Sequence, residues 1–405
     1  MSSVPGRSEP AVAPAFLPKE LLTAGLGEPC GVYLHVPFCA KRCGYCDFNT
    51  YAPADLGGTF SSGDYLDAVT AEVRLAGALL GAPVARTVFI GGGTPTMLEP
   101  NQLGIMLAAV RGCFALAADA EVTIEANPDS VRPDTMPALA ELGVTRVSLG
   151  MQSSQPHVLK VLDRTHDPEN VERAIGWAAE AGLATSLDLI YGTPGETLAD
   201  WRASLQAAIA LHPDHLSAYA LVVEDGTALA RRVRRGEVAA PIDDDQATKY
   251  ELADELLQAA GYHWYEVSNW SRSPEHRCRH NVSYWHNGNW WGFGPGAHSH
   301  VGGVRWWNHR HPNRYAAAVR TGQLPVAGHE ALSHEQRYTE LVLLRIRLAE
   351  GLPRRLLQPE GQQAVPPLVN DGLVTIEAPE DEARIVLTRR GRLLADGVVR
   401  RLLDW

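Results

Sequence analysis

The feature that most restricts the fold of this chain is a unit that occurs six times. In each unit a short apolar run is followed by turn residues and then by a helical pattern. Six such units predict a parallel sheet with right-handed crossovers. Because a closed barrel of this kind has eight strands, an open, partial barrel is the first choice and a doubly wound sheet the second. The predicted strands cover residues 31–36, 87–90, 121–125, 146–150, 186–191 and 215–221, with helices expected at 64–80, 101–115, 168–181 and 198–211.

Unusual residues stand where these strands end. The first strand runs into three cysteines and the second into the turn Gly91–Pro95. The next three strands end in or carry Glu125, Gln152 and Asp188. In parallel α/β folds the active site lies at the carboxyl ends of the strands, so these side chains are expected to share one site.

The cysteines Cys39, Cys43 and Cys46 have the spacing C-x3-C-x2-C, which is not a disulfide framework. Thiolates bind iron–sulfur clusters and zinc. Structural zinc takes four ligands, whereas three cysteines on a four-iron cluster leave one iron open for S-adenosylmethionine (SAM). The spacing therefore favours a [4Fe–4S] cluster. The alternatives are a zinc loop completed by Cys30 or His35, and three incidental thiols.

The turn Gly91–Pro95 lets backbone groups approach a ligand closely. It has neither the Lys-Ser/Thr of a P-loop nor the G-x-G-x-x-G of a dinucleotide fold. Polar residues at or beyond the strand ends could hold a ribose or an amino acid group, and they could equally be helix caps or hydrogen-bonded core residues. These residues are Glu125, Gln152, Arg164 and Asp188.

Composition excludes some classes of function. The net charge of −11 argues against a nucleic-acid partner, and the basic run at 231–235 is typical of a solvated helix face. No stretch approaches the length of a transmembrane helix. Residues 1–28 lack the apolar core of a signal peptide and are expected to form a flexible tail. A cytoplasmic location is expected, with a peripheral membrane contact left open.

The pattern changes after about residue 226. A helix near 246–260 and a strand at 262–267 precede a segment that is dense in tryptophan and histidine: seven of the ten Trp and eight of the fifteen His lie between His263 and His311. A planar ligand favours aromatic walls and heme iron accepts a histidine, but a Trp-rich lid over the open barrel end is the alternative. The main heme candidates are His280 and Trp285, with His286, His298, His300, His309 and His311 as alternatives. The last ~85 residues are predicted to form a small helical domain with a hairpin-like stretch at 373–387.

Several motifs together resemble the HemN/HemW branch of radical SAM proteins, over nearly the whole chain after the tail. HemN-like coproporphyrinogen III dehydrogenases carry a further cysteine two positions after the third, where this chain has Phe48. Phe48 and the H-N-x-x-Y-W motif are similar to the HemW group, which is regarded as a group of heme chaperones. The motifs that carry the resemblance are 33–39 (YLHVPFC), 46–49 (CDFN), 91–95 (GGGTP), 146–152 (RVSLGMQ), 188–192 (DLIYG), 215–220 (HLSAYA), 265–269 (YEVSN), 280–285 (HNVSYW) and 292–299 (GFGPGAHS).

The resemblance implies an α/β fold, a radical SAM partial (β/α)6 TIM-like barrel at 29–225. A Trp/His-rich extension over the barrel at 226–320 and a small, mostly helical C-terminal HemN-type domain at 321–405 complete the expected organisation. The implied cofactors are a [4Fe–4S] cluster on Cys39, Cys43 and Cys46, SAM, and heme contacted by His280. Tyr33, Gly92 and Glu125 would contact the SAM on the cluster. Positions that hold a second SAM in the dehydrogenase correspond to Gly93, Thr94, Gln152, Arg164, Asp188 and Ala220, and Tyr45 is a further cofactor-binding candidate.

Two functions are compatible with these motifs as a whole, and a zinc-binding structural protein is a third alternative. The first is a heme chaperone that passes heme to a recipient, such as a respiratory, membrane-associated hemoprotein. The second is an oxygen-independent coproporphyrinogen III dehydrogenase, in which a radical abstracts hydrogen from a propionate and loss of CO2 leaves a vinyl group. Phe48 and the motif at 280–285 favour the first.

Overall fold

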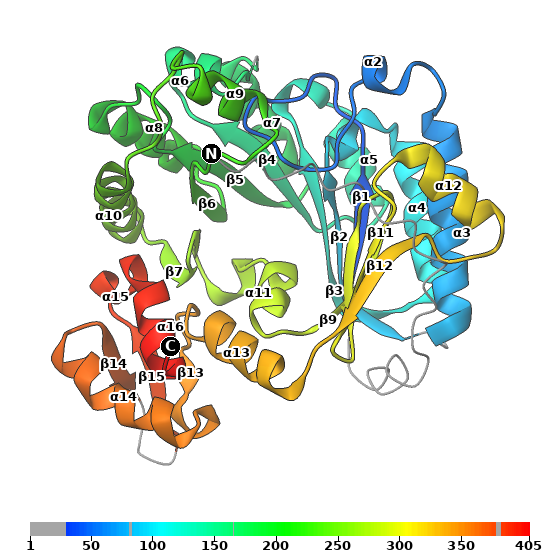
Figure 1. The fold of residues 1–405 in the computed structure, drawn as a ribbon. Helices are drawn as coiled ribbons and strands as arrows, with labels where there is room; N and C mark the ends of the chain where they lie inside the picture. The colour runs from blue at the N-terminus through cyan, green and yellow to red at the C-terminus, as the bar shows by residue number, and fades with distance from the viewer. Residues whose placement is uncertain (1–29, 81–82, 165, 378–381) are drawn as a thin grey trace.

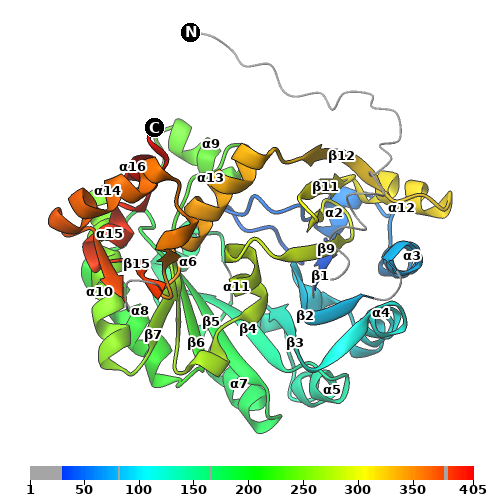
Figure 2. The same ribbon diagram turned by 90° about the horizontal axis from the view of Figure 1, so that it is seen from below.

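The computed structural model describes residues 30–405 except 81–82, 165 and 378–381. Its main sheet has twelve strands in the order β12-β11-β10-β9-β1-β2-β3-β4-β5-β6-β8-β7. The strands β1 to β6 are parallel and, seen from below, curve into an open barrel with helices outside (Figures 1 and 2). The expected partial barrel is therefore confirmed. Its strands are β1 (Cys30–Val36), β2 (Val84–Gly92), β3 (Ala115–Ala126), β4 (Arg146–Gln152), β5 (Ala184–Tyr191) and β6 (His215–Ala220).

The local sequence explains where the helices that follow the strands begin and which of their faces are buried. In α8, Thr197 and Asp200 form a reciprocal capping box: the Asp200 N–H donates to Thr197 Oγ1 at 3.1 Å and the Thr197 N–H to the Asp200 carboxylate at 2.9 Å. In α7, the buried side chains recur at helical spacing, as in Val171, Ala174 and Ala178. The helices of the barrel and its loops are α2 (Pro53–Leu56), α3 (Ser62–Leu80), α4 (Pro100–Cys113), α5 (Thr135–Glu141), α6 (Pro156–Val161), α7 (Pro168–Glu180), α8 (Leu198–Ala210), α9 (Ala228–Arg234) and α10 (Asp243–Ala259).

The Trp/His-rich segment extends the sheet at both of its edges. At one edge β9 (Asn289–Phe293) pairs in parallel with β1, and β10 (His298–Val301), β11 (Val304–Asn308) and β12 (Val326–Ala331) continue antiparallel. At the other edge β8 (Asn269–Ser271) and β7 (His263–Glu266) follow β6. These strands satisfy the unpaired backbone groups of the two sheet edges, and the extension of this segment over the barrel stays a prediction.

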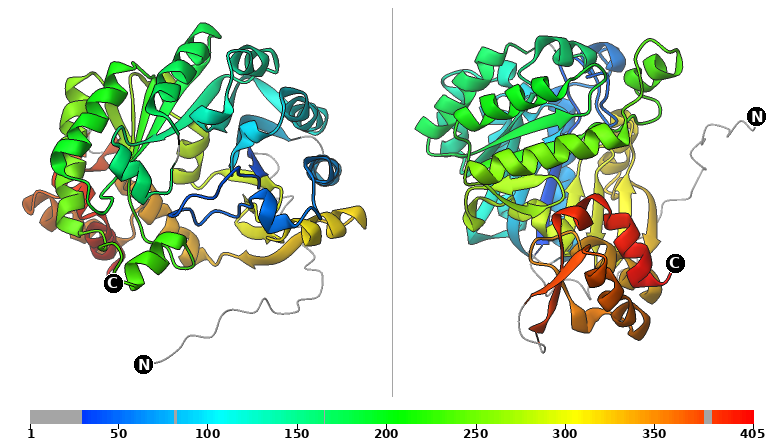
Figure 3. Two further views of the ribbon diagram at one scale, coloured as in Figure 1. Left: turned by 90° about the horizontal axis from the view of Figure 1, so that it is seen from above. Right: turned by 90° about the vertical axis from the view of Figure 1, so that its left-hand side faces the viewer.

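The C-terminal residues form a second, smaller packing unit. Helices surround a three-stranded sheet, and their buried side chains make a separate cluster that includes Val342, Ile385 and Val398. Figure 3 shows the unit beside the lower part of the barrel. There, Nη1 and Nη2 of Arg392 donate to the Asp254 carboxylate at 2.9 and 3.0 Å. Its elements are α13 (His334–Arg345), β13 (Leu352–Pro353), α14 (Pro359–Asn370), β14 (Val374–Glu377), β15 (Arg384–Leu387), α15 (Arg389–Leu393) and α16 (Ala395–Leu403), preceded by α12 (Pro312–Arg320).

The hairpin expected at 373–387 corresponds to the antiparallel pair β14 and β15. The domain limits near residues 225 and 320 stay predictions. Among the described residues, none of the helices has the length and apolar character that crossing a bilayer requires.

Candidate functional site

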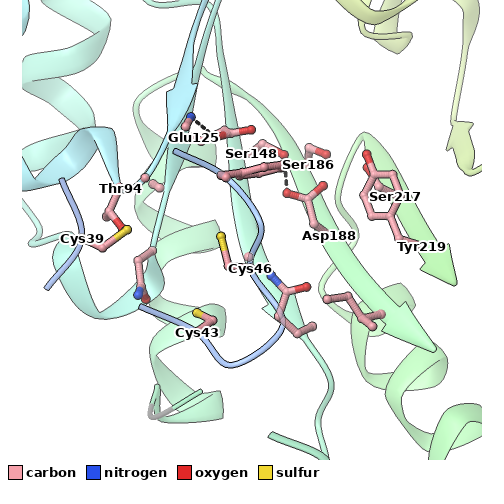
Figure 4. A pocket seen from close by; sticks show the side chains of 18 of the residues that line it. Cys39, Cys43, Cys46, Thr94, Glu125, Ser148, Ser186, Asp188, Ser217 and Tyr219 are labelled. Carbon is pink, nitrogen blue, oxygen red and sulfur yellow. Dashed lines mark hydrogen bonds between the residues drawn. The ribbon is translucent and has the colours of Figure 1, made fainter. Parts of the chain in front are cut away.

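A cavity of about 730 Å³ opens at the carboxyl ends of the barrel strands and reaches into the barrel (Figure 4). This volume lies in the range of small-molecule and cofactor sites. All three cysteines of the motif line the cavity. So do all ten residues expected to bind cofactors: Tyr33, Tyr45, Gly92, Gly93, Thr94, Glu125, Gln152, Arg164, Asp188 and Ala220.

The cysteine loop is held at its base and at its tip. At the base, the Cys39 N–H donates to Tyr51 O at 3.1 Å. At the tip, the Gly44 N–H donates to Leu162 O at 3.1 Å, and Gly44 O accepts from the Leu229 N–H at 2.7 Å. The loop therefore rests on the ends of α6 and α9, and its three sulfurs gather around one space at the cavity mouth (Figure 4).

The surroundings of the thiols suit a cluster. Arg164 Nη1 lies 3.6 Å from Cys43 Sγ, and Thr94 Oγ1 lies 3.9 Å from Cys39 Sγ. Such donors stabilise the thiolates that iron requires. Burial acts in the opposite direction on Cys46: it raises the pKa of this thiol to about 11, so iron binding would have to displace its proton. The described residues contain no group of three Cys, His, Asp or Glu side chains that could hold a single metal ion. A four-iron cluster makes a different demand, because each thiolate binds a different iron.

The glycine turn after β2 lies against the cysteine loop. A Cβ on Gly93 would lie 2.3 Å from Phe38 O and 3.0 Å from Cys39 Sγ. Gly92 has a φ of +111°, and its N–H donates to Glu125 Oε2 at 3.0 Å. Only glycine permits this approach, so the turn lies directly against the cysteine loop at the cavity wall.

Two carboxyl groups face the cavity below the cysteines. Burial, and secondarily Asp188, raise the pKa of Glu125 to about 8. Burial also raises the pKa of Asp188, against the opposing effect of hydrogen bonds, one of them from Ser148 Oγ to Asp188 Oδ2 at 2.9 Å. Both carboxyl groups would gain free energy from a cationic ligand, which favours their charged forms.

The other predicted residues complete the cavity wall. Gln152 has a left-handed φ of +62°, which is uncommon outside glycine. Arg164 Nη2 donates to Gly150 O at 2.8 Å, while its Nε is buried without a partner. Tyr33 OH donates to His35 Nδ1 at 2.9 Å, because Nε2 of that ring donates to Asn49 O at 2.9 Å. Tyr45 and Ala220 line the same wall.

The residues predicted as heme contacts do not all lie at the cavity. His280 lies on α11 (Arg279–Trp285), which crosses the centre of the ring of strands in the view from below (Figure 2). His280 is only 2% exposed, and both ring nitrogens are engaged: Nδ1 with Thr87 Oγ1 at 2.8 Å and Nε2 with Tyr284 OH at 2.7 Å. Trp285 is not among the cavity-lining residues. Neither are the alternatives His286, His298, His300, His309 and His311, in the part of the chain that the structure describes.

Sequence reasoning missed the polar interior of the barrel. Ser148, Ser186, Ser217 and Thr123 line the cavity from the middle of apolar strands, and Tyr219 lies beside Ser217 (Figure 4). A lone hydroxyl residue inside an apolar strand was the available signal, since a residue at such a position on a barrel strand faces the interior.

Comparisons with known proteins agree with this geometry. Residues 33–208 match the model of the radical SAM superfamily. The heme chaperone HemW of Mycobacterium tuberculosis is 54% identical over 378 residues, which are 93% of this chain and 95% of that protein. The heme chaperone HemW of Bacillus subtilis is 32% identical over 380 residues, or 90% and 97% of the two chains. The solved structure of coproporphyrinogen III oxidase HemN from Escherichia coli has a TM-score of 0.81 at 23% identity, covers 95% of this chain and 92% of that chain, and shows the fold alone.

The open barrel and its three-cysteine mouth are those of a radical SAM protein, a class that uses a [4Fe–4S] cluster and SAM. Within that class, the near-full-length identity to two HemW proteins decides the group: the chain belongs to the HemW family.

Proposed function

We propose that this protein binds heme and delivers it to recipient hemoproteins as a heme chaperone. The observation that carries the proposal is the 54% identity over 93% of the chain to a protein named heme chaperone HemW. The match does not stop at the end of the radical SAM barrel. It continues through the Trp/His-rich segment and the C-terminal unit. Phe48 supports the same function, because it lines the cavity at the position where the dehydrogenases carry a further cysteine.

Within this proposal, Cys39, Cys43 and Cys46 hold the cluster. Tyr33, Gly92 and Glu125 contact the SAM on it. When bound and reduced, the cluster and SAM supply a 5′-deoxyadenosyl radical. The roles proposed for the chain are to bind and orient: the Glu125 carboxylate would accept from the ammonium group of SAM. The same cavity wall, by its resemblance to the dehydrogenases, offers a second SAM the residues Gly93, Thr94, Gln152, Arg164, Asp188 and Ala220.

For heme, His280 remains the proposed contact, and its surroundings set a condition on binding. Both ring nitrogens are engaged and burial lowers the pKa of the ring to about 3, so the imidazole is neutral, as an iron ligand must be. Heme ligation by His280 therefore requires one of these two hydrogen bonds to break, either the one to Thr87 on β2 or the one to Tyr284 on α11 itself. Trp285, on the same helix, is proposed as the second contact.

The proposed recipients are hemoproteins, including respiratory ones at a membrane. A cytoplasmic location with peripheral membrane contact stays a prediction.

The test is made anaerobically on the protein with its reconstituted cluster. Heme is titrated while its absorption band is followed. Coproporphyrinogen III, SAM and a reductant are then supplied and the products analysed. Stoichiometric heme uptake without decarboxylated product is expected. Product formed at many turnovers would replace the proposal with the dehydrogenase function.

A further inference from the structure

The arm of the cysteine loop that follows Cys46 is anchored by a distant part of the chain. Asn49 Nδ2 donates to Pro295 O at 2.9 Å and to Arg310 O at 2.8 Å, across sequence separations of 246 and 261 residues. The backbone O of Asn49 accepts from His35 Nε2 at 2.9 Å. One residue thus connects the loop to strand β1 and to the turn at 294–296, which lies between β9 and β10.

The turn is shaped to receive this side chain. Gly296 has a φ of +73°, and a Cβ there would lie 2.7 Å from Asn49 Nδ2. Gly294 has a φ of +103°, and a Cβ there would lie 2.5 Å from His35 O. Any side chain at either position would therefore push the loop or β1 away. The motif at 292–299 thus has a physical role beside the cysteine loop, although it lies far from the three cysteines in the sequence.

The turn is fixed independently of the loop. Its Gly294 N–H donates to Glu72 Oε2 at 2.9 Å, and Glu72 also accepts from Asn308 Nδ2 at 2.7 Å and from Tyr315 OH at 2.5 Å. Glu72 is fully buried on α3. A carboxyl group with three donors and no exposure is a rigid connection between the helix, the turn and β11.

We propose that Asn49, seated on the turn 294–296, is a positioning residue that holds the arm of Cys46 in its cluster-binding conformation before the cluster is loaded. None of these hydrogen bonds uses a sulfur atom, so none of them needs iron as a partner. The proposal rests on the assignment of the cluster to the three cysteines. It does not rest on heme binding.

The first experiment uses Asn49→Asp, which keeps the shape of the side chain but turns a carboxylate oxygen toward two carbonyl oxygens. The loss of two hydrogen bonds should raise amide exchange across residues 38–51 of the cluster-free protein by about tenfold or more. Cluster content after anaerobic reconstitution should fall, and the EPR spectrum of the reduced cluster should change. Asn101→Asp, the same change at an exposed helix start, should behave like the wild type.

A second pair of variants separates local from global effects. Gly296→Ala should lose cluster content, whereas Gly322→Ala should keep it, because Gly322 has a similar φ of +76° with nothing within 4 Å of the added Cβ. Melting temperatures of the cluster-free proteins show whether each variant folds. Wild-type exchange, cluster content and EPR spectrum in folded Asn49→Asp would overturn the proposal. So would equal losses in Gly296→Ala and Gly322→Ala.

Discussion

The buried position of His280 leads to a quantitative prediction about Glu121. This carboxylate accepts the Arg279 N–H at 2.9 Å and the His280 N–H at 3.0 Å, and so holds the first turn of α11 inside the barrel. Its negative charge also suits the amino end of a helix. Glu121→Gln keeps the size of the side chain but replaces one acceptor by a donor that faces an N–H group.

The expected magnitude follows from these two bonds. A hydrogen bond to a charged group contributes about 1.5–3 kcal/mol, so losing one should raise the population of released α11 by about 10- to 100-fold. If heme binds only to molecules in which α11 is released, the apparent heme affinity rises by the same factor. The reason is that the apparent affinity is proportional to the fraction of molecules able to bind heme.

The assay combines two measurements on the cluster-loaded protein. Hydrogen exchange of residues 279–285 reports release of the helix, and heme titration reports affinity. Glu172→Gln, an exposed change on α7, serves as the control. Unchanged exchange and unchanged heme affinity in Glu121→Gln, in a protein whose heme band still depends on His280, would refute the reasoning.

Three further outcomes are expected. Cys43→Ala should abolish the cluster, because the motif has only three thiolates and each one binds an iron. A content of about four iron and four sulfide ions per chain in that variant would contradict the assignment. His280→Ala should weaken heme binding and leave the cluster intact, and unchanged heme affinity would move the site to another histidine. Glu125→Gln should change how the stability of the cluster-free chain depends on pH. Since burial and Asp188 raise the pKa of Glu125 from 4.5 to about 8, the folded chain holds this proton more tightly than the unfolded chain, and the free energy of unfolding falls as pH rises between those values. Denaturation at about pH 5 and about pH 8 should show a smaller fall in the variant.

The sequence by itself predicted the barrel and the three-cysteine motif, because the strand–helix periodicity and the cysteine spacing are local features of the chain. The predicted strands 146–150 and 215–221 begin at the first residues of β4 and β6. The predicted cofactor residues meet in one cavity, since the carboxyl ends of parallel strands share one edge of the sheet. Their individual roles remain proposals.

Only the tertiary structure decided how the Trp/His-rich segment is used. Its composition suggests aromatic walls or a lid, but the pairing of β9 with β1 and of β8 with β6 depends on which sheet edges are free. Local propensity carries no information about those edges, which exist only once the six-stranded barrel has formed. The same holds for His280 in the barrel interior and for Asn49 on the turn at 294–296. Each depends on a contact between segments that the sequence keeps far apart.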